Sequence, residues 1–172
     1  LRDFAEWLEA AGETDAAASA RRYGAASALG TELELPGPVG ERNLYALHPR
    51  GRILIRPATR AGLFAQIAAV LATGNRAAIE GMALPADLPA SVVAVFRNDS
   101  AEPYAAALVE GGPARVAAMV ETAAAMPGPI FSVHAASPDQ PLAYPLDWLI
   151  EETSISINTA AAGGNASLMM IG

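Results

Sequence analysis

Few side chains in this sequence are arranged for chemistry. Ser132, His134 and Asp139 are the residue types of a hydrolase triad, but no G-x-S-x-G nucleophile elbow accompanies them. Glu151 and Glu152 do not suit an acid–base pair, because adjacent side chains point apart on a strand and diverge on a helix. The chain has no cysteine, which excludes a thiolate nucleophile. We therefore predict no catalytic residue and interpret both groups as structural or solvated.

Metal and phosphate sites are not indicated either. The two histidines, His48 and His134, are far apart in the sequence on separate predicted strands, which favours structural roles. Glycines occur in the stretches GPVGER, EGG and AAGG, but none of these is a G-x-G-x-x-G that follows a strand. Turns explain these glycines better. We predict no metal ligands and no phosphate-binding loop.

The composition indicates one folded, acidic domain. The chain has 172 residues, of which 52% are hydrophobic and 17% charged, so it can bury a sizeable core. Its formal net charge is -7, and an acidic surface repels phosphate backbones, so we expect no nucleic-acid binding by this segment. Alanine-rich stretches such as 61–75 are too short to span a bilayer. The missing cysteines fit a reducing compartment, and we expect a cytoplasmic segment of a longer polypeptide.

The hydrophobic patterns alternate between strand and helix, which is typical of an α/β layered sheet. The helix at 60–73 is expected to be amphipathic, and a turn at 49–51 to join two strands as a hairpin. The sequence predicts helices at 1–11, 14–29, 60–73 and 113–126, the last with Val116, Val120 and Ala123 along one side. It predicts strands at 43–48, 52–56, 77–79, 92–96, 105–110, 130–135 and 155–158.

The C-terminal region has a different pattern. ISIN at 155–158 alternates as a strand does, and a Gly-Gly-Asn turn and a second apolar run follow it, which predicts a β-hairpin flap. Such a hairpin buries little of itself and needs a partner surface. Tyr144, Trp148 and Leu149, just before it, are assigned to packing. The predicted flap and interdomain contacts are Ile155, Ile157, Asn158, Gly163, Gly164, Asn165, Leu168, Met169 and Met170.

The fold expected from these patterns is a Rossmann-like, three-layer α/β domain with a C-terminal β-hairpin flap. We divide the chain into an N-terminal helical segment or linker at 1–34, a Rossmann domain at 35–150 and the flap motif at 151–172.

Two stretches resemble a known family. SISINTAAAGGNASLMMIG, at the C-terminus, is similar to the closing motif of proline utilization A proteins. The stretch 40–81, which contains RILIRPATRAGLF and TGNRAAIEG, is similar to the C-terminal domain of their long forms and, more distantly, to the cofactor-binding half of aldehyde dehydrogenases. The resemblance implies a parent enzyme with an FAD-dependent proline dehydrogenase and an NAD-dependent glutamate semialdehyde dehydrogenase.

The resemblance also implies that this segment is a degenerate copy of the aldehyde dehydrogenase nucleotide domain. Active members carry an oxyanion-binding asparagine after the strand equivalent to 52–56, where this chain has Thr59. They carry a cofactor-binding lysine after the strand equivalent to 77–79, where this chain has Glu80. An acid in place of a base disfavours an anionic cofactor. No cofactor is therefore expected in this segment.

The function implied by the resemblance is non-catalytic. The segment is expected to cover the substrate channel and support the aldehyde dehydrogenase module, with FAD and NAD bound elsewhere in the parent. Its partners are then the catalytic modules of the same polypeptide, with a homo-oligomer as a further option. Two alternatives stay open, a regulatory NAD-binding module and a dimerisation domain.

Overall fold

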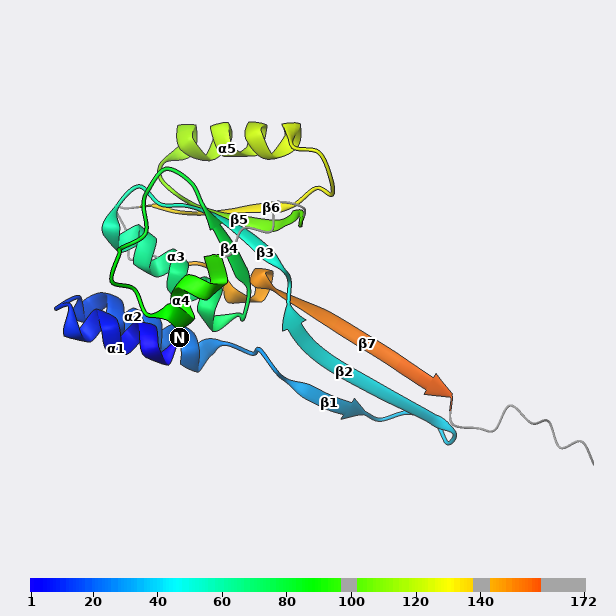
Figure 1. The fold of residues 1–172 in the computed structure, drawn as a ribbon. Helices are drawn as coiled ribbons and strands as arrows, with labels where there is room; N and C mark the ends of the chain where they lie inside the picture. Colours follow the sequence, from blue (N-terminus) through cyan, green and yellow to red (C-terminus); the bar gives the residue numbers. More distant parts are fainter. Residues whose placement is uncertain (97–101, 138–142, 159–172) are drawn as a thin grey trace, which may run out of the picture.

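A computed structural model describes residues 1–96, 102–137 and 143–158 of the chain (Figure 1). Within these residues a parallel sheet has the strand order β4-β3-β5-β6, and an antiparallel sheet has the order β1-β2-β7. Figure 1 shows the parallel sheet among the helices and the antiparallel sheet projecting from them. We call the antiparallel sheet the arm, which consists of β1 (Glu32–Leu35), β2 (Glu41–Pro49) and β7 (Ile150–Asn158).

The parallel sheet is built from two strand–helix–strand units. Helix α3 joins the first two strands and helix α5 the last two, and all three strand pairs are parallel. Strands buried on both faces have continuous apolar runs, which is why ILI and AALV stand at its centre. The elements are β3 (Arg52–Arg56), α3 (Arg60–Ala72), β4 (Arg76–Ile79), β5 (Tyr104–Glu110), α5 (Pro113–Ala125) and β6 (Ser132–Ala136).

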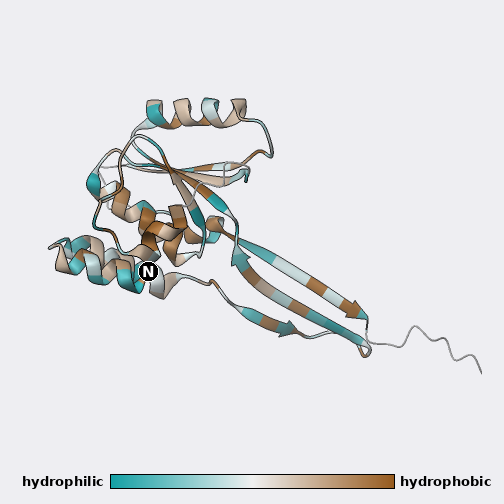
Figure 2. Ribbon diagram, viewed as in Figure 1, coloured by the Kyte–Doolittle hydropathy of each residue, from teal (hydrophilic) through white to brown (hydrophobic). Residues whose placement is uncertain are grey.

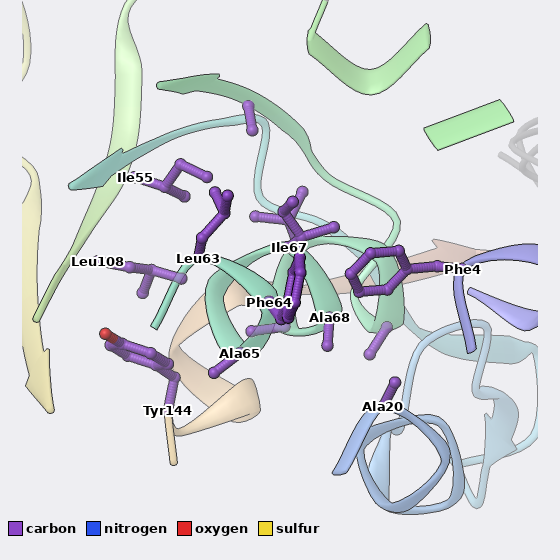
Figure 3. Packing of buried hydrophobic residues seen from close by; sticks show 14 of the residues in the cluster. Phe4, Ala20, Ile55, Leu63, Phe64, Ala65, Ile67, Ala68, Leu108 and Tyr144 are labelled. Atoms are coloured by element: carbon purple, nitrogen blue, oxygen red, sulfur yellow. The ribbon is translucent and has the colours of Figure 1, made fainter. Parts of the chain in front are cut away.

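The helices lie on both faces of this sheet. Helices α1 (Arg2–Ala10) and α2 (Thr14–Ala26) pack with α3 on one face, where Phe4, Phe64 and Leu108 share a core cluster (Figure 3). Helix α5 lies on the other face, where Met119 is buried in a smaller cluster. The three-layer α/β fold predicted from the sequence is therefore confirmed.

The expected amphipathic character of the helix at 60–73 is wrong. Ten of the thirteen residues of α3 are buried, including the polar Gln66. The reason is that α1 and α2 cover the side of α3 that faces away from the sheet (Figure 3). A helix that is apolar all round belongs in the middle of a core.

Helix α5 confirms the expected packing side in part, since Ala123 packs against the core and Val116 is half-buried. Met119 is its one fully buried residue, whereas Val120, expected on the packing side, is 49% exposed. The α5 layer is therefore thin, and its core contacts come from Met119 with support from Ala123 and Met126.

The predicted hairpin across 49–51 is wrong. β2 and β3 are neighbours in sequence but belong to different sheets, since β2 pairs with β1 and β7 and β3 pairs with β4 and β5. Gly51 (φ 131°) lies where the chain passes from the arm into the body. The apolar run of β3 needs cover on both faces, which the arm does not provide.

The predicted strand at 92–96 is also wrong. These residues form the end of a short helix, α4 (Ala90–Val93), and a 3-10 helix, η1 (Ala94–Phe96). Val92 is buried in the same core cluster as α1, and Ser91 Oγ donates a hydrogen bond to Asp3 at 2.7 Å. Tertiary packing here overrides the strand preference of a β-branched run. No described helix is long and apolar enough to cross a membrane.

Candidate functional site

The candidate site lies at the carboxyl ends of β3, β4 and β5. Helix α3 leaves β3 toward one side of the sheet and α5 leaves β5 toward the other, on the opposite face. Open α/β sheets bind ligands in the crevice beside such a switch point. Thr59 caps the N-terminus of α3, Glu80 directly follows β4, and Glu110 ends β5.

The carboxyl group of Glu110 occupies the N-terminus of α3. Glu110 has no exposed surface. It accepts hydrogen bonds from the backbone N–H groups of Ala58 at 2.6 Å and Thr59 at 2.8 Å, and from Thr59 Oγ1 at 2.6 Å. A helix N-terminus is the position where nucleotide-binding folds hold a phosphate. In this chain a carboxyl group from the neighbouring strand takes these donors.

The backbone of α3 is adapted to this carboxyl group. Thr59 Oγ1 accepts a hydrogen bond from the Gly62 N–H at 3.0 Å while it donates to Glu110, so its donor and acceptor capacities are both used. A Cβ atom at Gly62 would collide with the Glu110 carboxyl group. The close approach of β5 to α3 therefore requires glycine at this position.

Arginine side chains lie at the same edge of the parallel sheet. The guanidinium of Arg56 forms an ion pair with Glu80 at 3.5 Å, and both side chains are partly exposed. Arg115 Nη2 donates to the carbonyl oxygen of Pro57 at 2.9 Å. An exposed pair of this kind contributes only about 0–1 kcal/mol to the stability of the fold. Its main effect is on the distribution of charge at this edge of the sheet.

A buried polar network lies on the α2–α3 side of the sheet. Gln66 Nε2 donates to Tyr144 Oη at 2.7 Å, and Tyr23 Oη accepts from the Tyr144 N–H at 2.7 Å. Burial raises the pKa of the Tyr144 hydroxyl, which therefore stays protonated. The network connects α2 and α3 to the segment that leads into the 3-10 helix η2 (Leu146–Leu149), which precedes the arm strand β7.

The other residues considered for chemistry are dispersed. Ser132 Oγ and His134 Nε2 are hydrogen-bonded at 2.8 Å, but Asp139 lies outside the described residues. Glu151 is paired with His48 and Glu152 with Leu47 across the arm, so the two carboxyl groups lie on opposite faces of β7. Within residues 1–96, 102–137 and 143–158, no group of three or more potential metal ligands is found.

The predicted flap residues are only partly described. Ile155 and Ile157 are exposed on β7, and Asn158 ends it. β7 pairs along its whole length with β2, a strand from the other end of the chain, so the flap is part of a three-stranded arm and not a local hairpin alone. Of the three packing residues, Tyr144 and Leu149 are buried, whereas Trp148 is 56% exposed. Gly163, Gly164, Asn165, Leu168, Met169 and Met170 lie outside the described residues.

We expect His134 to make the stability of the domain depend on pH. Burial and then the nearby Arg50 lower its pKa in the folded state. The unfolded chain, with a histidine pKa of about 6.5, therefore binds more protons than the folded chain below that pH, and stability falls as the pH decreases. We expect His134→Gln to flatten this dependence in urea unfolding measured between about pH 7 and 5. Ser132→Ala should preserve it, because neither cause involves that hydroxyl; a flat profile for Ser132→Ala would contradict this origin.

Sequence comparison assigns the chain to a family. No family model matches it. The bifunctional protein PutA of Rhizobium meliloti is 53% identical over 100% of this chain and 15% of the relative, and PutA of Escherichia coli is 38% identical over 100% of this chain and 14% of the relative.

The chain is a PutA domain. It spans between 12% and 15% of the length of the curated relatives that it matches. Among solved structures, PutA with proline bound in remote sites is 21% identical over 72% of the domain and 15% of that chain, with a TM-score of 0.49. PutA from Corynebacterium freiburgense is 15% identical over 82% of the domain and 13% of that chain, with a TM-score of 0.49. The assignment depends on the sequence relatives.

Glu110 is the residue of this site that the sequence did not indicate. Its local signal is an acidic residue that ends an apolar strand directly before Gly111-Gly112 and a helix. Its role requires knowing that β5 lies beside β3, and the sequence alone does not give that neighbour.

Proposed function

We propose that the chain is the non-catalytic C-terminal domain of a bifunctional PutA enzyme that oxidises proline to glutamate. In this proposal the catalytic modules of the same polypeptide bind FAD and NAD in the cytoplasm, and the domain covers the substrate channel and supports the aldehyde dehydrogenase module. The observation that carries the proposal is the Glu110 carboxyl group at the N-terminus of α3.

Glu110 argues against a nucleotide at this crevice. A dinucleotide pyrophosphate would need the donors that Glu110 already engages, Ala58 N–H, Thr59 N–H and Thr59 Oγ1. It would also bring negative charge toward a buried acidic side chain, which is unfavourable in a low-dielectric site. A ligand would therefore have to displace a side chain that the fold holds in place. The alternative of a regulatory NAD module is disfavoured for the same reason.

The arm supports a role in contact with other parts of PutA. It projects from the body (Figure 2), and several of its apolar side chains are exposed. About 85% of the length of the Rhizobium meliloti relative lies outside the segment matched by this chain, which covers 15% of it. A domain that closes over a channel excludes water and retains a reactive intermediate. Contact of this kind needs no catalytic residue in the domain itself.

Calorimetric titration of the isolated domain with NAD tests the absence of a nucleotide site. We expect no saturable heat at NAD concentrations that saturate the full PutA enzyme, which serves as the positive control. Saturable binding by the isolated domain would contradict the proposal and would favour the regulatory NAD module instead.

A further inference from the structure

Three segments join the arm to the body within residues 1–96, 102–137 and 143–158. One precedes β1, one connects β2 to β3, and one leads from η2 into β7. All three lie against the turn between α3 and β4, residues 72–75, which we call the joint. The three strands of the arm are paired with one another, so the joint is the place where their common direction relative to the body is set (Figure 1).

Asn75 holds two of these segments with one side chain. Its Oδ1 accepts a hydrogen bond from the Gly51 N–H at 2.8 Å, just after β2, and its Nδ2 donates to the carbonyl oxygen of Leu149 at 2.7 Å, just before β7. Nδ2 also donates to Thr73 Oγ1 at 2.7 Å, inside the joint. Asn75 is only 2% exposed, so water competes little for these groups.

An amide side chain suits both backbone partners of Asn75. The Gly51 N–H can only donate and the Leu149 carbonyl oxygen can only accept, so the residue between them must offer an acceptor to one and a donor to the other. A carboxylate would offer acceptors alone, and an apolar side chain would offer neither. The hydrogen bonds across the joint therefore depend on the chemistry of this side chain as well as on its size.

The third segment, before β1, is held by Ser27 and by the close approach of the chain to Gly74. Ser27 Oγ donates to the carbonyl oxygen of Ala72 at 2.6 Å. Gly74 has a φ of 66°, and a Cβ atom there would lie 2.9 Å from Leu29 and 3.2 Å from Pro49. Glycine permits both the left-handed turn and the close packing of the segments that lead to β1 and from β2.

A small error at the joint becomes a large one at the far end of the arm. Strands β2 and β7 have nine residues each, and a strand of nine residues is about 30 Å long. A rotation of about 10° at the joint would therefore move the far end by about 5 Å. Displacements far smaller than this, of about 1 Å, can change the rate of an enzyme strongly even when the altered residue is remote from the chemistry.

We infer that Asn75 is a positioning residue for the coupled oxidation carried out by PutA. Its side-chain amide sets the direction in which the arm leaves the body, and this direction determines how the whole domain is placed relative to the catalytic modules. The inference rests on the proposed function and adds to it a residue whose loss uncouples the two activities while the body of the domain stays folded.

Two measurements on full PutA test this role with Asn75→Ala. The Gly51 amide should exchange its hydrogen at least about tenfold faster, because it loses its buried acceptor, while the amides of α3 stay protected. The ratio of NADH formation to proline oxidation should fall at least about threefold, because the arm leaves the body in the wrong direction. Gly74→Ala should lower the same ratio by crowding Leu29 and Pro49, and it tests the joint without removing a hydrogen-bonding side chain.

The matched control is Met119→Ala. Met119 is fully buried on the opposite face of the sheet, so its loss destabilises the body without touching the joint. It should leave the Gly51 exchange rate and the ratio as they are in the unaltered enzyme. A fall in the ratio as large as that of Asn75→Ala would overturn the inference, because general destabilisation would then explain both results.

The joint variants also separate this inference from the proposed function. An unchanged ratio in both Asn75→Ala and Gly74→Ala, together with lost coupling after deletion of the domain, would overturn the inference alone. An unchanged ratio after deletion of the whole domain would reject the proposed function itself.

Discussion

Replacing Glu110 with alanine is expected to remove a large part of the stability of the domain. The change leaves the N–H groups of Ala58 and Thr59 and the Thr59 hydroxyl without their acceptor at a partly buried site. A buried unsatisfied donor costs about 1–3 kcal/mol, so we expect a loss of about 3–5 kcal/mol from a total that is typically about 5–15 kcal/mol. Urea unfolding of the isolated domain measures this loss.

The matched control for this prediction is Glu80→Ala. Glu80 also follows a strand of the same sheet, but its pair with Arg56 is partly exposed, so its removal should cost no more than about 1 kcal/mol. Glu110→Gln should fall between the two, because the amide preserves the shape and one acceptor oxygen but adds a donor that faces other donors. Equal unfolding midpoints for Glu110→Ala and Glu80→Ala would show that Glu110 does not fix β5 to α3.

The layered α/β fold was predictable because its signals are local. The apolar run at 53–55, the periodic pattern after Thr59 and the alanine-rich run at 77–79 together specify a strand–helix–strand unit with parallel pairing. What the sequence did not reveal is which surfaces meet. The outer side of α3 is covered by residues such as Phe4 and Ala20, which precede it by tens of positions.

Errors arose where distant packing overrides local preference. The run at 92–96 has the composition of a strand, yet Val92 is buried against the core as part of a helix. The partner of β2 is β7, more than a hundred residues away, and no turn residue could indicate that pairing. The first strand of the predicted flap is therefore part of a sheet with β1 and β2, and the turn and second strand of that predicted hairpin lie outside the described residues.

From the sequence, single positions of the candidate site could be predicted, but not how they come together. Thr59 and Glu80 lie at one edge of the parallel sheet, the edge at which open α/β sheets bind nucleotides. Glu110 completes this edge from a strand that follows β4 after a long connection, so only the folded chain brings it to Thr59. The need for glycine at position 62 could not be predicted for the same reason. Only in the folded chain does the Glu110 carboxyl group occupy the space that a side chain would need.

Deleting the domain from the full PutA enzyme is expected to separate its two activities. Proline oxidation should be largely retained, because the proposal assigns the domain no part in that chemistry. Coupled formation of NADH from proline should fall by at least about tenfold, because the deleted enzyme would lose the intermediate or the support of its aldehyde dehydrogenase module. A tenfold fall in rate corresponds to about 1.4 kcal/mol of activation free energy. Full enzyme carrying Glu80→Ala provides a control with the domain present and folded.

The measurement that tests the account most directly is therefore the rate of NADH formation from proline, compared between full PutA and PutA without this domain at equal rates of proline oxidation. The account predicts that this rate falls by at least about tenfold in the deleted enzyme although the first oxidation continues. An unchanged rate would contradict it, because a domain without its own chemistry would then also have no effect through its contacts.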